Sequence, residues 1–248
     1  IDRALFAVVM EAYVHGVSTR KVDDLVAALG ATSGISKSEV SRICAGLDEE
    51  MAAFRTRGLD HVEFPYVFLD ATYLKARVGN QVVARAVVVA TGVTATGERE
   101  VLGCAIGDSE DKVFWTQFLR DLRARGLSGV RLVISDAHEG LKAAISTVML
   151  GAAWQRCRVH FMRNLLARVP RASAEMVAAA VRTIFAQPDA QAVHQQFDRI
   201  VTMLDAQFPD VAAMLIDAKV DLLAFSAFPL EHWRKIWSTN PLGRLHRE

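Results

Sequence analysis

Residues 66–75 read YVFLDATYLK, and this stretch decides the fold. Aromatic and β-branched residues dominate it, which predicts a β-strand. Asp70 sits near its middle, between Leu69 and Ala71, where burying an unpaired carboxylate would carry a large desolvation cost. Something in the folded protein must offset that cost, either a structural salt bridge or a functional ligand.

A second apolar stretch, residues 130–136 (VRLVISD), also ends in an acid, Asp136. Two aspartates on neighbouring strands can meet at one edge of a sheet. Mg²⁺ takes oxygen ligands, commonly one or two carboxylates together with substrate phosphates. Asp70 and Asp136 are therefore predicted to be metal ligands. Asp136 could also cap the helix that follows, since aspartate is a favoured N-cap.

The composition is that of a globular protein: of 248 residues, 52% are hydrophobic and 23% charged. No stretch reaches the ~18 consecutive apolar residues of a membrane helix, and no secretory signal opens the chain. Three cysteines without CxxC spacing fit a reducing compartment. We therefore expect no membrane partner and a cytoplasmic location. The chain begins without Met and stops in a basic segment, which suggests a fragment.

Positive charge is concentrated in two segments, although the net charge is only +1. Residues 154–171 hold five arginines and no acid, and residues 232–247 are also basic without an acid. Such clusters are typical of a phosphate-binding surface. A solvated helix face is the alternative. The basic residues in question are Arg156, Arg158, Arg163, Arg168, Arg171, Arg234, Lys235, Arg244 and Arg247.

Residues 1–62 are predicted to be an N-terminal helical DNA-binding region. A helix, a short glycine-containing turn and a second helix capped at residues 36–39 resemble a helix-turn-helix DNA reader. Lys37 and Arg42 lie near the start of that second helix. A plain helical hairpin is the alternative.

The periodicity changes after residue 62, and residues 63–170 are predicted to form a mixed α/β sheet. Three strands come first, at 66–76, 81–91 and 100–106, joined by hairpin-type turns. A helix capped at 107–109 follows, and then a strand to 136, a helix over 139–148, a strand over 152–156 and a basic helix to 169. This order is the one used by RNase H-like nucleic-acid enzymes.

Helical periodicity dominates the remaining chain. Residues 171–237 are predicted to be an all-α insertion with helices over 174–186, 190–208, 211–225 and 229–237. Residues 238–248 then begin a further helix, with an N-cap cluster followed by Pro241 at a position suited to the first turn. We interpret them as the start of a final core helix that is cut short.

Several long motifs in this order resemble the mutator-type transposases of bacterial insertion sequences. They are FLDATYLKAR (68–77), REVLGCAIGDSED (99–111), the stretch from FWTQFL to LKAAI (114–145), AAWQRCRVHFMRNLL (152–166), RTIFAQPDA (182–190) and HWRKIWSTNPLGRLHRE (232–248). The resemblance implies an RNase H-like core that holds a DDE triad, with a helical insertion between the second Asp and the Glu. By this match Asp70 is the first acid and Asp136 the second.

The resemblance also implies an activity and its partners. These are Mg²⁺-dependent (or Mn²⁺-dependent) cleavage and strand transfer on double-stranded DNA, with the terminal inverted repeats and the target as substrates. A homodimer or higher oligomer on DNA and a location at the bacterial nucleoid follow from the same likeness. Two metal ions about 3.5–4 Å apart serve such in-line displacements.

The third acid departs from the family pattern. Gly243 stands where the family carries its catalytic Glu, and His246 replaces an Asn. Glu248 lies five residues further on, roughly 140° round a helix, and is a poor substitute. We therefore expect a chain that keeps the fold and DNA affinity but is impaired in strand cleavage.

Two further motifs allow more than one interpretation. Cys157 and His160 form a Cys-x-x-His pair, but a structural zinc site needs about four ligands and no second pair is apparent. The resemblance makes the pair a family signature near the DNA, together with Arg158 and Arg163. Trp233 flanks Arg234 and Lys235 and is either a core residue or a platform for a stacked base.

Three functions are therefore compared. The first is a DNA transposase that uses Mg²⁺, and the second is an inactive remnant that binds transposon ends. The third, an RNase H-type nuclease unrelated to transposition, fits the acids but not the long motifs. Measuring Mg²⁺-dependent cleavage separates the first from the others, and end-specific DNA binding without cleavage would select the second.

Overall fold

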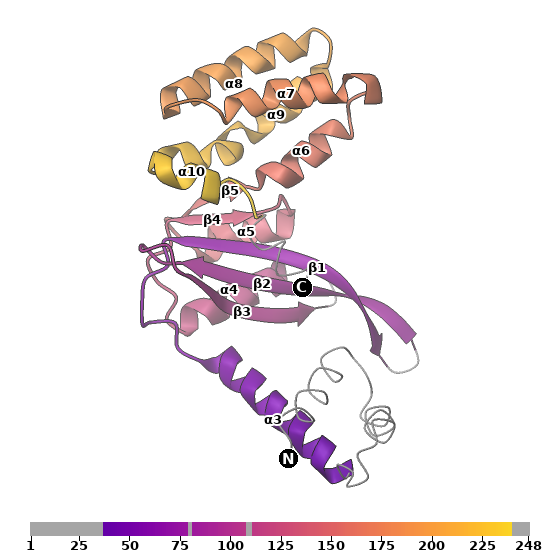
Figure 1. Cartoon of the computed structure of the whole chain (residues 1–248), viewed down its shortest axis with the longest axis vertical. Helices are drawn as coiled ribbons and strands as arrows, with labels where there is room; N and C mark the ends of the chain where they lie inside the picture. The colour runs from indigo at the N-terminus through magenta and orange to yellow at the C-terminus, as the bar shows by residue number, and fades with distance from the viewer. Residues whose placement is uncertain (1–36, 79–80, 108–110, 240–248) are drawn as a thin grey trace, which may run out of the picture. The chain divides into compact units, whose positions relative to one another are not determined.

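The structure, a computed structural model, describes residues 37–78, 81–107 and 111–239 (Figure 1). The chain divides into two compact units, Ile1–Arg57 and Gly58–Glu248. In the first unit the described element is helix α3 (Lys37–Thr56), which confirms the helix predicted after residue 36. The preceding helix and turn of the predicted DNA reader lie outside the described residues, so the helix-turn-helix stays a prediction.

The second unit is built on one five-stranded sheet with the order β3-β2-β1-β4-β5. The strands are β1 (Tyr66–Val78), β2 (Gln81–Val93), β3 (Arg99–Gly107), β4 (Leu132–Ser135) and β5 (Ala153–Arg156). β2 runs antiparallel to β1 and β3, whereas β4 and β5 run parallel to β1. A mixed sheet in this order, with β2 alone reversed, is the RNase H-like arrangement, and it confirms the predicted fold class.

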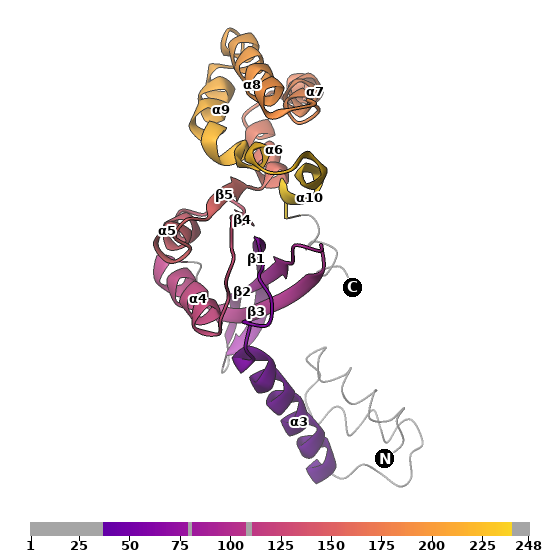
Figure 2. The same ribbon diagram turned by 90° about the vertical axis from the view of Figure 1, so that its left-hand side faces the viewer.

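Helices α4 (Lys112–Ala124) and α5 (Glu139–Val148) cover one face of the sheet (Figure 2). Their buried side chains pack against Val67, Leu69 and Val133 of the strands. Successive side chains of a strand point to opposite faces. Odd-numbered positions of the first half of β1 therefore belong to this core, and even-numbered positions face the other way.

A second core joins the opposite face of the sheet to the helices that follow β5 (Figure 1). Tyr66, Phe68, Leu132 and Ile134 of the sheet contribute to it. The helices are α6 (Arg158–Leu166), α7 (Ala174–Ile184), α8 (Ala190–Asp205), α9 (Pro209–Leu222) and α10 (Trp233–Ile236), with 3₁₀ turns η1 (Arg171–Ser173), η2 (Ala224–Ala227) and η3 (Leu230–His232). The all-helical character predicted for residues 171–237 is confirmed. Within the described ranges, no helix has the length and apolar character needed to cross a membrane.

Some local predictions were wrong at helix ends. Helix α4 is capped by Asp111, whose Oδ1 accepts a hydrogen bond from the Phe114 amide at 2.8 Å, and not by residues 107–109. Helix α6 ends at Leu166 rather than 169, since a residue before a proline, here Pro170, is disfavoured in the helical region. The helix predicted over 229–237 is a 3₁₀ turn followed by the short α10.

Candidate metal and DNA site

Asp70 lies in β1, and Asp136 directly follows the adjacent parallel strand β4. β1 and β4 pair with Phe68 opposite Ile134, and the same register carried two residues further sets Asp70 opposite Asp136. Asp136 follows the last residue of β4 and does not cap α5, because His138 occupies the N-cap position. Both carboxylates are partly exposed. Neighbouring strands are about 4.8 Å apart, which is close enough for two carboxylates to share one ion.

The face of the sheet on which Asp70 lies follows from its position in β1. Tyr66 and Phe68 face the second core, and Asp70 continues this alternation. The acid therefore lies on the face from which the C-terminal helices rise, and not among the apolar side chains under α4 and α5.

His160 of α6 is linked electrostatically to both aspartates. Hydrogen bonding to the Cys157 thiol is the largest cause that raises the pKa of His160, and the negative charges of Asp136 and Asp70 raise it further. Burial acts in the opposite direction on this imidazole. The Cys157 thiol and the two carboxylates therefore favour the positively charged form of His160.

Cys157 connects three segments at this edge of the sheet. Its backbone N–H donates to Ser135 O at 2.6 Å, and its Sγ accepts from the amide and the hydroxyl of Thr239 at 3.3 and 3.4 Å. Burial raises the pKa of the Cys157 thiol, but hydrogen bonds from His160 and Thr239 outweigh burial and bring it to about 7. The chain that leaves α10 is thus held beside the ends of β4 and β5.

Arg158 reinforces this connection. Its amide donates to Trp237 O at 2.9 Å, and its guanidinium lies 4.1 Å from the centre of the Trp237 ring. The guanidinium also lies 5.0 Å from the centre of the Phe185 ring, and burial lowers the pKa of Arg158. Arg158 is therefore partly buried, with its guanidinium against two aromatic rings, and its DNA-binding role stays a prediction.

The other predicted DNA-binding residues fall into two groups. Arg42 in the first unit and Arg163, Arg234 and Lys235 in the second are exposed. Arg156 is partly buried, and its guanidinium lies over aromatic rings. The side chain of Lys37 lies outside the described residues.

Trp233 is a core residue. Only 5% of it is exposed, its Nε1 donates to Phe228 O at 2.8 Å, and its ring meets Phe225 edge to face. The buried indole of Trp233 packs in the second core and leaves no open ring face on which a base could stack.

No complete metal site is formed by the described residues. Over residues 37–78, 81–107 and 111–239, no group of three or more His, Cys, Asp or Glu side chains is arranged to hold an ion. Two carboxylates suffice for Mg²⁺, which keeps several waters and takes phosphate oxygens as further ligands. The oxygen donors of Asp70 and Asp136 fit such an ion. Gly243 and Glu248 lie outside the described residues.

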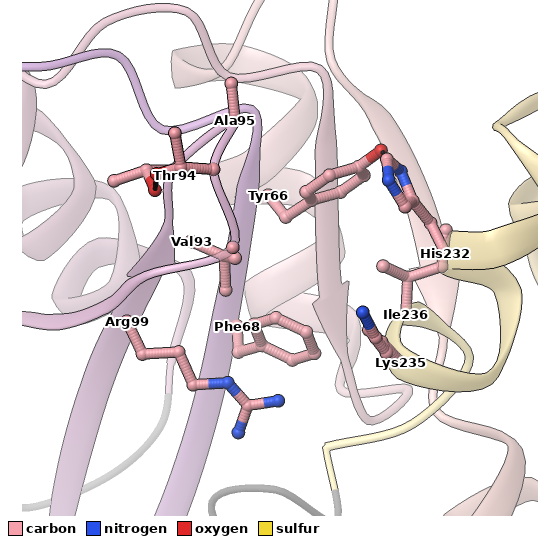
Figure 3. Close-up of a pocket in the computed structure, with 11 residues that line it drawn as sticks. Tyr66, Phe68, Val93, Thr94, Ala95, Arg99, His232, Lys235 and Ile236 are labelled. Carbon is pink, nitrogen blue, oxygen red and sulfur yellow. Dashed lines mark hydrogen bonds between the residues drawn. The ribbon is translucent and has the colours of Figure 1, made fainter.

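A pocket that the sequence did not predict lies on the same face of β1 (Figure 3). Tyr66 and Phe68 form part of its wall, and the Tyr66 hydroxyl is 2.7 Å from His232 Nδ1. Burial raises the pKa of Tyr66, so the phenol stays protonated. The alternation of apolar residues along β1 was visible in the sequence. The residues of the opposite pocket wall were not, because His232, the partner of Tyr66, lies 166 positions further along the chain.

A mixed sheet of this order, with aspartates at adjacent strands, places the protein in the RNase H-like class. The chain belongs to the Mutator family of transposases, because the family model "Transposase, Mutator family" matches residues 1–248. This is the family that the sequence motifs predicted.

Curated relatives are described as transposases for insertion sequence elements. The chain is 49% identical over 247 residues to the transposase for insertion sequence element IS1081 of Mycobacterium tuberculosis. It is 41% identical to that of IS406 of Burkholderia multivorans and 35% identical to that of IS256 in transposon Tn4001 of Staphylococcus aureus. Each alignment covers 100% of this chain and, in the same order, 59%, 64% and 63% of the relative.

Among solved structures, the chain resembles the HTLV-2 integrase catalytic core domain in complex with magnesium. The TM-score is 0.26 at 16% identity, over 49% of this chain and 85% of that one. A superposition this loose supports no conclusion, and the fold is assigned from the strand order.

Proposed function

We propose that the protein is a DNA transposase of an insertion sequence that cleaves and transfers DNA strands with Mg²⁺ or Mn²⁺. The observation that carries this proposal is the β1–β4 register, which pairs Phe68 with Ile134 and, when carried two residues further, sets Asp70 opposite Asp136. Membership of the Mutator family agrees with it. The chain spans about 60% of the length of its curated relatives, so the activity of the whole protein is part of the proposal.

Each residue has a chemical role in this proposal. Asp70 and Asp136 would hold the metal, which when bound activates an oxygen nucleophile and stabilises the leaving oxygen. His160, whose pKa is raised, would donate a hydrogen bond to the phosphate next to the carboxylates. Arg163 and Arg234 are exposed and would bind the DNA backbone, a contribution that weakens as salt rises.

The partners are the double-stranded terminal repeats and the target DNA, held by a homodimer or a larger oligomer because two ends must be joined. Access to chromosomal DNA requires the bacterial cytoplasm, and the nucleoid is the proposed location.

A second candidate function is that of an inactive transposase remnant that binds DNA ends. It is favoured by one observation, the glycine at position 243 where the family motif carries Glu. A metal site with one carboxylate fewer binds its ions more weakly, so the cleavage rate would fall more than the affinity for DNA. Such a protein could act as a repressor or an inactive subunit.

The test is Mg²⁺-dependent nicking of a terminal-repeat duplex by the full chain, Gly243→Glu, Asp70→Asn and Asp136→Asn. Asp205→Asn, an exposed acid at the end of α8, is the matched control. We expect Gly243→Glu to nick much faster than the parent chain, and each aspartate change in that background to abolish nicking. Equal nicking with and without Asp70 would refute the metal site. Binding without nicking in every variant would select the second function.

A further inference from the structure

Two arginines are neighbours where the start of α6 meets the end of α7. Arg158 is the first residue of α6, and Arg182 lies in the last turn of α7. Arg182 and Phe185 are three residues apart on α7 and therefore share one face of it, and the centre of the Phe185 ring lies 5.0 Å from the Arg158 guanidinium. Burial is the largest cause that lowers the pKa of Arg158, and the positive charge of Arg182 lowers it further. The two guanidinium groups are thus close enough to repel each other.

This arginine pair, Arg158 and Arg182, carries more positive charge than its surroundings balance. Within the part of the chain that the structure describes, neither side chain forms an ion pair or a hydrogen bond. The Cys157 thiolate attracts Arg158, but one thiolate can balance only one of the two cations. Since like charges at close range disfavour each other, an external anion between the two guanidinium groups would stabilise the pair.

Arg158 is held in a fixed orientation before any anion binds. Its guanidinium lies 4.1 Å from the centre of the Trp237 ring and 5.0 Å from that of Phe185, and these two rings meet edge to face. A guanidinium stacked on an aromatic ring keeps its N–H groups available at the edge of its plane. None of the Arg158 side-chain nitrogens is among the buried polar atoms that lack a partner, and Arg182 is exposed. Both groups can therefore donate to an anion that arrives from solvent.

The position of the arginine pair indicates where the anion comes from. Arg158 directly follows Cys157, whose amide donates to Ser135 O at 2.6 Å, and Ser135 directly precedes Asp136. The pair therefore lies beside the carboxylate end of the sheet. Guanidinium groups bind phosphate through paired, charge-assisted hydrogen bonds. A DNA strand with one phosphate at the carboxylates carries further phosphates on both sides of it, and one of these can reach the pair.

We infer that Arg158 and Arg182 together bind one phosphate of the DNA backbone, a short distance along the strand from the phosphate that is cut. The inference rests on the proposed function, since it takes DNA as the source of the phosphate. It goes beyond that function because it assigns a DNA contact to α7, for which the sequence predicted none.

The test combines protein variants with DNA in which single phosphates are neutral. Binding of a fluorescent terminal-repeat duplex is measured by anisotropy in EDTA, so that cleavage plays no part. A single methylphosphonate, which removes one negative charge, is moved through each strand of the duplex. The variants are Arg182→Gln, Arg182→Lys and Arg158→Gln. The matched control is Arg199→Gln, which changes an exposed arginine on α8 of the same helical segment.

We expect Arg182→Gln to weaken binding about tenfold at low salt. It should also reduce the slope of log K against log[salt] by up to about 0.9, the value for one phosphate. Arg182→Lys should keep the slope but lose part of the affinity, because an ammonium cannot bind phosphate through a two-pronged contact. At one position, the methylphosphonate should weaken binding about tenfold for the parent chain and for Arg199→Gln, but about twofold or less for Arg182→Gln and Arg158→Gln.

Three outcomes would overturn the inference. One is that no methylphosphonate has an effect that depends on Arg182, and another is that Arg199→Gln changes affinity and slope as much as Arg182→Gln does. The third is displacement of the duplex by submillimolar inorganic phosphate at constant ionic strength, which would make the pair a site for free phosphate. Because Arg182 is exposed, its variants decide the matter even if Arg158→Gln unfolds. Duplex binding without such a position refutes this inference alone, whereas a complete lack of duplex binding refutes the proposed function as well.

Discussion

Gln155 of β5 joins the sheet to the helical segment through an entirely buried side chain. It is 0% exposed. Its Nε2 donates to Leu222 O at 2.9 Å and to Arg156 O at 2.8 Å, and its Oε1 accepts from the Phe225 amide at 2.7 Å. Leu222 ends α9, where carbonyl groups have no partner inside the helix. One glutamine side chain thus forms hydrogen bonds with the backbone of Leu222 and Phe225, about seventy residues further along the chain.

The change Gln155→Leu keeps the approximate volume and removes all three hydrogen bonds. The Phe225 amide and the Leu222 carbonyl would then be buried without partners, at a cost of about 1–3 kcal/mol each. The added apolar surface of leucine returns on the order of 1 kcal/mol. We therefore expect a loss of about 1–5 kcal/mol in the free energy of unfolding. For a unit of this size, that corresponds to a fall of roughly 2–20 °C in Tm.

The assay is thermal and urea unfolding followed by circular dichroism, with amide hydrogen exchange at Phe225 as a local readout. Gln117→Leu is the matched control, because Gln117 is an exposed glutamine on α4. Exposed substitutions of this kind usually change stability by no more than about 0.5 kcal/mol. If Gln155→Leu unfolds at the same temperature as Gln117→Leu, or if the Phe225 amide stays protected, the assigned hydrogen bonds do not hold the two parts together.

Three more perturbations address other contacts. A Cβ at Gly92 would clash with the Phe64 ring, so Gly92→Ala should lower the free energy of unfolding, measured in urea, by about 1–3 kcal/mol. Gly46→Ala in α3, where a Cβ meets nothing within 4 Å, should be neutral or stabilising. The pKa of the Cys157 thiol is about 7 in the folded protein and 9.0 ordinarily, so the thiolate adds stability as pH rises from about 7 to 9. The deficit of Cys157→Ala should therefore grow by up to roughly 2 kcal/mol between about pH 6.5 and about pH 8.5, and a constant deficit would contradict this. Arg158→Gln should cost about 1–2 kcal/mol and shift the emission of Trp237, and an unchanged emission would argue against the stacked guanidinium.

The sheet could be predicted because each of its long strands has a local sequence pattern typical of β-structure. β1 and β2 combine β-branched and aromatic residues with period-two alternation, and the turns between strands contain glycine. Helix starts were harder where several residues could serve as caps. Asp108, Ser109 and Asp111 are all good N-caps in the sequence, and the contact of the Asp111 carboxylate with the Phe114 amide distinguishes it in the structure.

The candidate site was predictable only where its chemistry is carried by single residues. Aspartates in or after apolar strands are unusual enough to be noticed from the sequence alone. The packing of Arg156 and Arg158 was not predictable, because a count of charges cannot reveal that Phe185 and Trp237 lie beside Arg158. Gln155 and the pocket were missed for the same reason. Their partners are remote in sequence and become neighbours only when the helical segment from α9 to α10 packs against the sheet.

Cys157 holds the chain that follows α10 at the sheet. Its thiol accepts hydrogen bonds from Thr239, and its amide donates to Ser135, which directly precedes Asp136. In the proposed transposase, Gly243 follows Thr239 by four residues and stands where the family motif carries Glu. Gly243→Glu changes neither of the residues that Cys157 contacts, so the proposal expects this variant to differ from the parent chain in nicking and not in folding.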